Sequence, residues 1–288
     1  MGAVSQNPYS PGFAVINGKE NSLKKWTIRI LVLLFLLTGS ACSQSVPPAE
    51  GEETLLVQGE SGGPENLPPA FDPVVPAAEA VDPQWFADAA FVGDSVSVML
   101  ENYNTSTGRL GSPAFFCSVS LSQTNALSYQ AGNARLPEYP KGSGQHPLVA
   151  DGIASAGAKK VYLMLGMNCI AGGVDRASQD LVTLVDQILA KSPEAAIFIQ
   201  SVTPMTADSP RADDALNNGT IQAFNERMRQ ICQEKQWYFV NVAEAVSDEN
   251  GFLRSEFSGD RAMGIHFNYD GAAAWADYLL THVPQALK

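Results

Sequence analysis

The sequence predicts an α/β fold, a three-layer α/β/α sandwich around a five-stranded, mainly parallel sheet of the flavodoxin-like kind. Two observations predict it. Short apolar runs alternate with longer stretches that are apolar on one face only, and the short apolar runs contain few polar residues. Uninterrupted apolar runs are typical of parallel strands covered on both faces. Strands that alternate with amphipathic helices place helical layers on both sides of a sheet.

The predicted strands are the apolar segments, and the predicted helices are the segments with helical periodicity between them. The strands cover residues 89–96, 114–119, 159–165, 195–202 and 237–242. The helices run from the first strand to about Tyr103, over 148–156, from 174 to the stop at Ser192-Pro193, over 221–232, and from the N-cap Asn268 onward. Residues 120–145 are rich in Ser, Gly and Pro and are predicted to form an extended loop.

The first 42 residues are predicted to be an export signal. A basic flank (Lys24, Lys25 and Arg29) precedes the apolar run 30–37, and small residues then lead to Cys42. The apolar run is shorter than the roughly 20 residues of a bilayer-spanning helix. Small residues before a cysteine resemble a bacterial lipoprotein signal, which implies lipidation of Cys42. A cleaved signal without lipid and an uncleaved anchor are the alternatives.

Residues 43–83 are predicted to be a disordered linker, because a segment rich in Pro, Gly, Glu and Ala buries too little apolar surface to offset its ordering entropy. Residues 84–288 are predicted to form one catalytic domain with a single core. The chain is therefore expected to be exported and to face the outside, held at the membrane by its N-terminus or secreted.

Composition argues against several partners and cofactors. The net charge of −12 is opposite to what binding to nucleic acid requires. Three histidines far apart in sequence, His146, His266 and His282, give no metal-ligand spacing, so neither metal nor cofactor is predicted. The cysteines other than Cys42 are expected to be thiols.

Three short motifs fall where chemistry is expected in such a fold. Gly93-Asp94-Ser95 follows the first strand, Gly166-Met167-Asn168 follows the third strand, and Gly264-Ile265-His266-Phe267 precedes the last helix. The carboxyl ends of parallel strands meet at one edge of the sheet, where ligands bind in open α/β folds. Residues far apart in sequence can therefore converge there.

Together the three motifs resemble the SGNH (GDSL-type) hydrolase family over residues 91–282. The resemblance implies that Ser95 is the nucleophile and His266 its general base, since an imidazole must remove the proton of a serine hydroxyl. It also implies that the Asn168 side chain and the Ser95 N–H bind the oxyanion, and that Gly166, in the same motif as Asn168, belongs to the oxyanion and substrate site. Asp94 is expected to brace the turn beside the site.

Two features depart from the family pattern. The position three residues before the histidine, where the family has an orienting aspartate, is Met263, and Asp260 is the substitute that we expect. A backbone carbonyl or a Ser–His dyad are the alternatives. The glycine that supplies an oxyanion N–H after the second strand is missing from 116–125, and an N–H near Ser120 or Ser122 is expected to replace it.

The function predicted from these residues is that of an exported, membrane-tethered serine esterase. It would remove O-acyl groups, such as acetyl, from a small molecule or a glycan through an acyl-serine intermediate. One alternative is an O-acyltransferase that uses the same site with a sugar hydroxyl in place of water. The other is a catalytically degenerate surface module that binds glycans.

Overall fold

A computed structural model of the chain describes residues 71–128 and 135–288. Its centre is a five-stranded sheet in the order β2-β1-β3-β4-β5, in which every neighbouring pair is parallel. The strands are β1 (Ala89–Gly93), β2 (Ala114–Cys117), β3 (Lys160–Met164), β4 (Ala196–Gln200) and β5 (Tyr238–Val240). The predicted fold class and sheet are confirmed.

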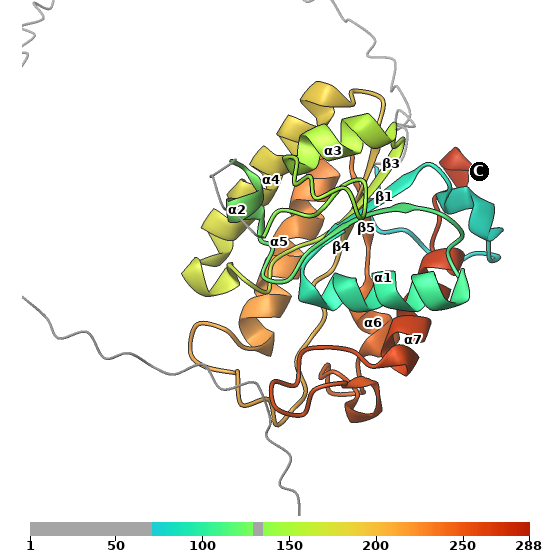
Figure 1. The fold of residues 1–288 in the computed structure, drawn as a ribbon. Helices are drawn as coiled ribbons and strands as arrows, with labels where there is room; N and C mark the ends of the chain where they lie inside the picture. The colour runs from blue at the N-terminus through green and yellow to red at the C-terminus, as the bar shows by residue number, and fades with distance from the viewer. Residues whose placement is uncertain (1–70, 129–134) are drawn as a thin grey trace, which may run out of the picture. The chain divides into compact units, whose positions relative to one another are not determined.

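Helices cover both faces of the sheet, as Figure 1 shows: α3, α4 and α5 lie on one side, and α1, α6 and α7 on the other. The helices are α1 (Ser95–Thr107), α2 (Gln123–Ala126), α3 (Val149–Ala156), α4 (Val174–Lys191), α5 (Asn218–Lys235), α6 (Val242–Val246) and α7 (Tyr269–Thr281). Short 3₁₀ turns are η1 (Pro83–Phe86), η2 (Ile170–Gly172), η3 (Ser255–Phe257) and η4 (Gln285–Leu287). Asn268 caps α7, as predicted.

The strands are shorter than the apolar runs that predicted them. The first apolar run continues to residue 96, but the strand ends at Gly93, and α1 begins at Ser95. Its remaining apolar residues belong to the first turn of a helix that packs on the sheet. Apolar residues in a strand and in the buried face of the next helix look alike in sequence, so the pattern overestimates strand length.

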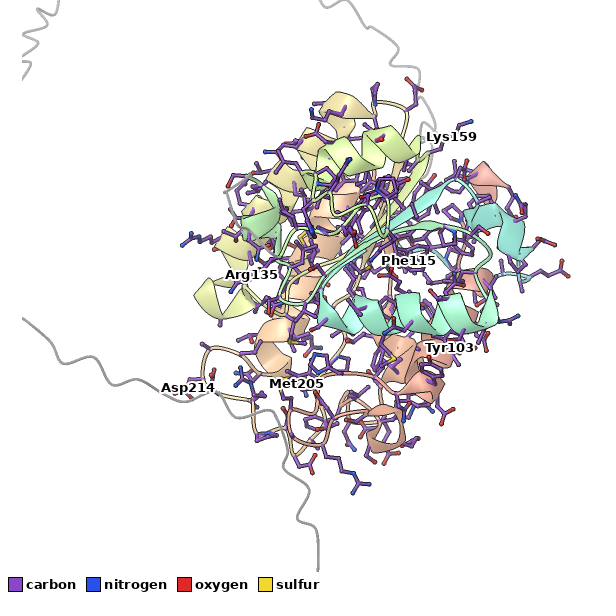
Figure 2. The ribbon with its side chains drawn as sticks, in the orientation of Figure 1. Tyr103, Phe115, Arg135, Lys159, Met205 and Asp214 are labelled. Atoms are coloured by element: carbon purple, nitrogen blue, oxygen red, sulfur yellow. The ribbon has the colours of Figure 1, made fainter. Side chains whose placement is uncertain are left out.

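One row of aromatic rings crosses the whole sheet, with one ring from each strand. The centroids of adjacent rings lie between 4.2 and 5.4 Å apart, and Phe115 at one end is labelled in Figure 2. The rings belong to Phe115, Phe91, Tyr162, Phe198 and Tyr238, which are partners in the strand register. Because a one-residue slip would move a ring to the other face, the row favours this register and so aligns the strand ends that carry the site.

Residues 71–83 lie along the folded domain rather than in the linker to which the sequence assigned them. The Val75 N–H donates to Phe239 O at 3.0 Å, the Phe239 N–H donates to Pro73 O at 2.6 Å, and Val75 is buried. The Ala78 N–H donates to Thr281 O at 2.8 Å. We call residues 71–82 the edge strap, because residues 73–75 pair with the open edge of β5 and Ala78 and Val81 hydrogen-bond to the end of α7. The predicted domain boundary at residue 84 is therefore too late.

The predictions for the export signal, Cys42 and the linker up to residue 70 lie outside the described residues. Within 71–128 and 135–288, none of the helices combines the length and apolar character that crossing a bilayer requires. Cys117, Cys169 and Cys232 are free thiols.

Candidate active site

Ser95 is presented at the carboxyl end of β1 by a tight strand-to-helix turn. Asp94 is the N-cap of α1, and its Oδ1 accepts the Val96 N–H at 3.0 Å. A Cβ on Gly93 would lie 1.9 Å from Ser97 Oγ, so only glycine lets the first turn of α1 approach the strand this closely. Ser95 is the first residue of the helix, and its N–H therefore has no acceptor within α1.

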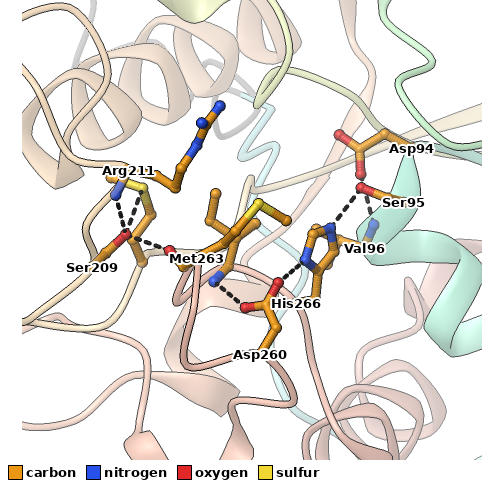
Figure 3. A network of polar contacts seen from close by, with 10 residues as sticks. Asp94, Ser95, Val96, Ser209, Arg211, Asp260, Met263 and His266 are labelled. Carbon is orange, nitrogen blue, oxygen red and sulfur yellow. Dashed lines mark hydrogen bonds and ion pairs between the residues drawn. The ribbon is translucent and has the colours of Figure 1, made fainter. Parts of the chain in front are cut away.

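Ser95, His266 and Asp260 form one hydrogen-bonded chain, drawn in Figure 3. The Ser95 hydroxyl lies 2.9 Å from His266 Nε2, and the opposite ring nitrogen, Nδ1, contacts Asp260 Oδ2 directly. With the Nδ1 proton donated to the carboxylate, Nε2 is the basic nitrogen that faces the serine. The structure thus brings together the three residues that were predicted as a triad.

A compact loop explains how an aspartate six residues before the histidine reaches its ring. The N–H groups of Met263 and Gly264 donate to Asp260 O at 3.0 and 2.7 Å, so the chain turns back at this point. The Gly259 N–H donates to His266 O at 2.8 Å, which places the two ends of the loop side by side. Asp260 then faces His266 across this pairing. We call residues 259–266 the histidine loop.

The electrostatics of the histidine loop favour an ionised Asp260. Partial burial raises the pKa of this carboxyl, but hydrogen bonds from His266 and from the Ile265 N–H outweigh burial and hold the pKa below its usual value. At neutral pH the group is therefore a carboxylate, which can orient the imidazole and stabilise its protonated form.

Asn168 and Asp94 are joined beside the serine. The Asn168 side-chain nitrogen lies 3.2 Å from Asp94 Oδ2 and 3.0 Å from Leu121 O, so it has two protein acceptors. The bracing role expected of Asp94 agrees with these contacts and with its capping of α1. Burial raises the pKa of Asp94 to about 6, although the Val96 N–H and the charge of His266 act in the opposite direction.

The turn after β2 distinguishes the two N–H groups that were candidates to replace the missing oxyanion glycine. The Ser122 N–H already donates to Asn125 Oδ1 at 3.0 Å in a capping box. Ser120 has a φ of 61°, the left-handed conformation that favours glycine. Within the described residues, its N–H has no acceptor. The sequence offered both serines as candidates, because the left-handed conformation of Ser120 carries no signal in residue type.

Gly166 forms the turn that carries Asn168. The residue is buried, and a Cβ there would lie 2.6 Å from Val202 Cγ2, so packing requires a glycine at this position. Its carbonyl accepts the N–H groups of Cys169 and Ile170 at 2.8 and 3.0 Å. A role of Gly166 in binding the oxyanion or substrate stays a prediction.

Within residues 71–128 and 135–288, no group of three His, Cys, Asp or Glu side chains is placed to hold a metal ion. The polar groups at the carboxyl edge of the sheet are a serine hydroxyl, an imidazole, a carboxylate and hydrogen-bond donors. This set suits acyl transfer.

The three-layer α/β/α fold and this constellation define a hydrolase, and the comparisons with known proteins specify its family. Residues 91–274 match the model of the GDSL-like Lipase/Acylhydrolase family. The chain belongs to this family and is a carboxylic ester hydrolase. No curated protein sequence matches it.

Solved structures agree with the fold. A proposed acylhydrolase from Bacteroides fragilis is 17% identical, with a TM-score of 0.53 over 74% of this chain and 92% of that protein. A proposed platelet activating factor from Streptococcus pneumonia is 20% identical, with a TM-score of 0.50 over 67% and 81%. A proposed lipolytic protein of the G-D-S-L family from Desulfitobacterium hafniense is 12% identical, with a TM-score of 0.50 over 68% and 99%.

Proposed function

We propose that this ester hydrolase is an exported serine esterase that removes small O-acyl groups through an acyl-Ser95 intermediate. One observation carries the proposal: the Ser95 hydroxyl meets His266 Nε2 at 2.9 Å, while Asp260 holds the opposite nitrogen of the ring. A serine hydroxyl becomes a nucleophile when a neighbouring base takes its proton, and the base must be held in the correct tautomer.

In the first half-reaction, Ser95 Oγ attacks the acyl carbonyl carbon while its proton moves to His266 Nε2. The tetrahedral intermediate collapses as the bond to the alcohol oxygen breaks, and His266 returns the proton to that oxygen. In the second half-reaction, His266 takes a proton from water and the hydroxide attacks the acyl carbon of the acyl-Ser95 ester. The bond from that carbon to Ser95 Oγ then breaks, the carboxylic acid leaves, and His266 returns the proton to Oγ. Asp260 stays ionised throughout and stabilises the imidazolium formed twice per turnover.

The oxyanion would be bound by the N–H groups of Ser95 and Ser120 and by the Asn168 amide. The backbone donors are supported by their lack of acceptors within the described residues. Asn168 differs, because Asp94 and Leu121 O already accept from its nitrogen, so donation to an oxyanion would have to replace or share one of these contacts. Each such donor typically contributes about 3 kcal/mol to the transition state.

The substrate proposed is an acetylated glycan outside the cell, and the chain would be held there by a lipid on Cys42. Support for this location comes from the sequence: a basic flank, a short apolar run and small residues that precede Cys42. Ser95 is half-buried and Asn168 is exposed, which suits access by an acyl group on a polymer. Replacing Cys42 by serine should move the protein from the membrane fraction to the medium, whereas membrane retention would contradict lipid anchoring.

The experiment that tests the function uses the full chain with p-nitrophenyl acetate, p-nitrophenyl octanoate and acetylated xylan. We expect release of acetate from the first and third, preference for the short acyl chain, and loss of turnover in Ser95→Ala but not in Ser106→Ala. Acetyl transfer to a glycan hydroxyl faster than hydrolysis would contradict the esterase and identify the acyltransferase. A folded chain without turnover that still binds xylan would identify the binding module.

The binding-module alternative rested on two departures from the family pattern, Met263 and the missing glycine. Asp260 contacts His266 Nδ1, and Ser120 has a φ of 61°, a conformation that favours glycine. Both reasons for that alternative are thereby weakened, and the esterase is the function we favour.

A further inference from the structure

We infer that Ser209, on the loop after β4, is a positioning residue that holds the histidine loop in its reactive geometry. The inference rests on the proposed function, since it concerns the same Ser95–His266–Asp260 chain. Figure 3 shows Ser209 next to Met263, on the side of the histidine loop away from Ser95. No sequence motif includes this serine.

Two consecutive carbonyls of the histidine loop accept hydrogen bonds from the loop after β4. The Ser209 hydroxyl donates to Met263 O at 2.5 Å, and the Thr206 N–H donates to Gly264 O at 2.9 Å. The two segments also touch at Gly264, where a Cβ would lie 2.2 Å from Thr206 Oγ1 and 3.1 Å from Ser209 Cβ. Residues 205–209 therefore form a backing for the histidine loop.

This backing is fixed to the rest of the domain. The Met205 N–H donates to Asn218 Oδ1 at 2.7 Å, and the Asn218 amide returns a hydrogen bond to Met205 O at 2.9 Å. Leu253 N–H donates to the same carbonyl at 3.0 Å. Met205 is fully buried, and its place below the sheet is labelled in Figure 2. Asn218 is the first residue of α5, so a long helix anchors the backing.

The histidine loop needs an external support because its aspartate and histidine are six residues apart. Its own turn is closed by hydrogen bonds to Asp260 O, which leave the carbonyls of Met263 and Gly264 pointing outward. The donors to these two carbonyls lie on the backing, residues 205–209. Ser209 is buried there, and its hydroxyl also accepts the Arg211 N–H at 3.3 Å. Catalytic groups must be held to within about 0.5 Å by such supporting contacts.

The test compares Ser209→Ala with Ser178→Ala in the full chain. Ser178 is also a buried serine whose hydroxyl donates to a backbone carbonyl, Val174 O at 2.8 Å, but it lies within α4. Turnover of p-nitrophenyl acetate is expressed per Ser95 labelled by a fluorophosphonate probe, so unfolded molecules are not counted. We expect Ser209→Ala to lower kcat by about 10- to 100-fold with KM within twofold, and Ser178→Ala to leave both unchanged.

A double-mutant cycle locates the effect. If Ser209 acts through the Asp260–His266 contact, Ser209→Ala should have little further effect on kcat in an Asp260→Asn background. Equal kcat values for Ser209→Ala and Ser178→Ala, or full additivity with Asp260→Asn, would overturn the inference while the esterase stands. A wild-type chain without turnover or labelling would instead refute the proposed function.

Discussion

The carboxylate of Asp260 supports the proposed chemistry through His266, since it contacts that ring and not Ser95. It contacts His266 Nδ1, and hydrogen bonds keep its pKa below the usual value. The Asp260→Asn variant keeps the size of the side chain but removes its charge and favours the wrong ring tautomer. We expect kcat to fall by about 10³- to 10⁴-fold, by analogy with serine proteases. Steady-state hydrolysis of p-nitrophenyl acetate measures the loss.

Asp270→Asn serves as the matched control, since Asp270 is an exposed acid in the first turn of α7. It should retain wild-type turnover. Asp260→Asn with more than one-tenth of the wild-type kcat would contradict the triad and indicate a Ser–His dyad.

Asp94 should make the stability of the domain depend on pH. Burial raises its pKa in the folded protein from the ordinary 3.8 to about 6, so the folded state binds this proton more tightly than the unfolded chain. Asp94 therefore makes its full contribution to the free energy of unfolding below about pH 4, and this contribution is lost as the pH rises towards 6.

The Asp94→Asn variant should remove this loss, because an amide still caps α1 but does not titrate. Between pH 4 and 7, its stability relative to wild type should rise by on the order of 1–3 kcal/mol. Urea unfolding of both proteins across this range measures the difference in their free energies of unfolding. Asp260 titrates in both proteins, so its effect cancels in this difference. A difference that is constant with pH would contradict the raised pKa.

Sequence reasoning identified residues whose chemistry is rare and missed those whose role is geometric. The contact of Ser95, His266 and Asp260 could be predicted because serine, histidine and aspartate are the residue types that a triad uses. The conformation of Ser120 and the backing role of Ser209 depend on backbone angles and on partners more than 50 residues away. Neither backbone angles nor distant partners can be predicted from residue type alone.

At the scale of elements, the histidine loop depends on a glycine whose backbone and surroundings both exclude a side chain. Gly264 has a φ of 65°, and a Cβ there would lie 2.2 Å from Thr206 Oγ1. Gly108, the C-cap of α1, has nearly the same φ of 66° but nothing within 4 Å of a Cβ. An alanine at Gly108 would therefore add backbone strain alone, whereas an alanine at Gly264 would add the same strain and a steric clash.

We expect Gly108→Ala to lower the free energy of unfolding by about 1 kcal/mol and to leave kcat unchanged. Gly264→Ala should cost more, and it should also lower kcat because it pushes the histidine loop away from its backing. Thermal unfolding and hydrolysis assays on both variants measure the effects. Equal losses of stability with no change in kcat would show that the contact with Thr206 is unimportant.

The edge strap was predicted as linker because its composition carries neither strand nor helix periodicity. Its contacts are backbone hydrogen bonds to Phe239 and Thr281, together with the buried Val75, and these partners are distant in sequence. Phe71 extends the aromatic row of the sheet, since its ring centre lies 5.9 Å from that of Tyr238. The sheet itself was predictable because its strands are continuous apolar runs.

Removing the edge strap should destabilise the domain. A chain that begins at residue 84 should unfold at a lower temperature than one that begins at residue 71, by several degrees for a domain of this size. The difference arises because β5 loses backbone partners and Val75 no longer covers its edge. Calorimetry of the two chains provides the comparison, and identical midpoints would mean that the strap contributes nothing.

For the whole molecule, the parallel sheet explains why residues at 95, 168 and 266 converge. The turns after β1 and β3 and the segment before α7 lie at the same sheet edge, and the aromatic row keeps the strands in register. The order of the motifs along the chain was therefore sufficient to predict the family, which the match over residues 91–274 confirms. The acyl group and its alcohol could not be predicted, because they depend on loop surfaces without a sequence signature.

The proposed function requires a covalent acyl intermediate on Ser95. Peptide mapping by mass spectrometry detects it in the full chain, after reaction with a fluorophosphonate and after rapid-quench reaction with p-nitrophenyl acetate. We expect a phosphonyl adduct and a transient acetyl group on Ser95, both absent from His266→Ala. Turnover without an acyl group on Ser95, or modification of a different serine, would contradict the proposed function.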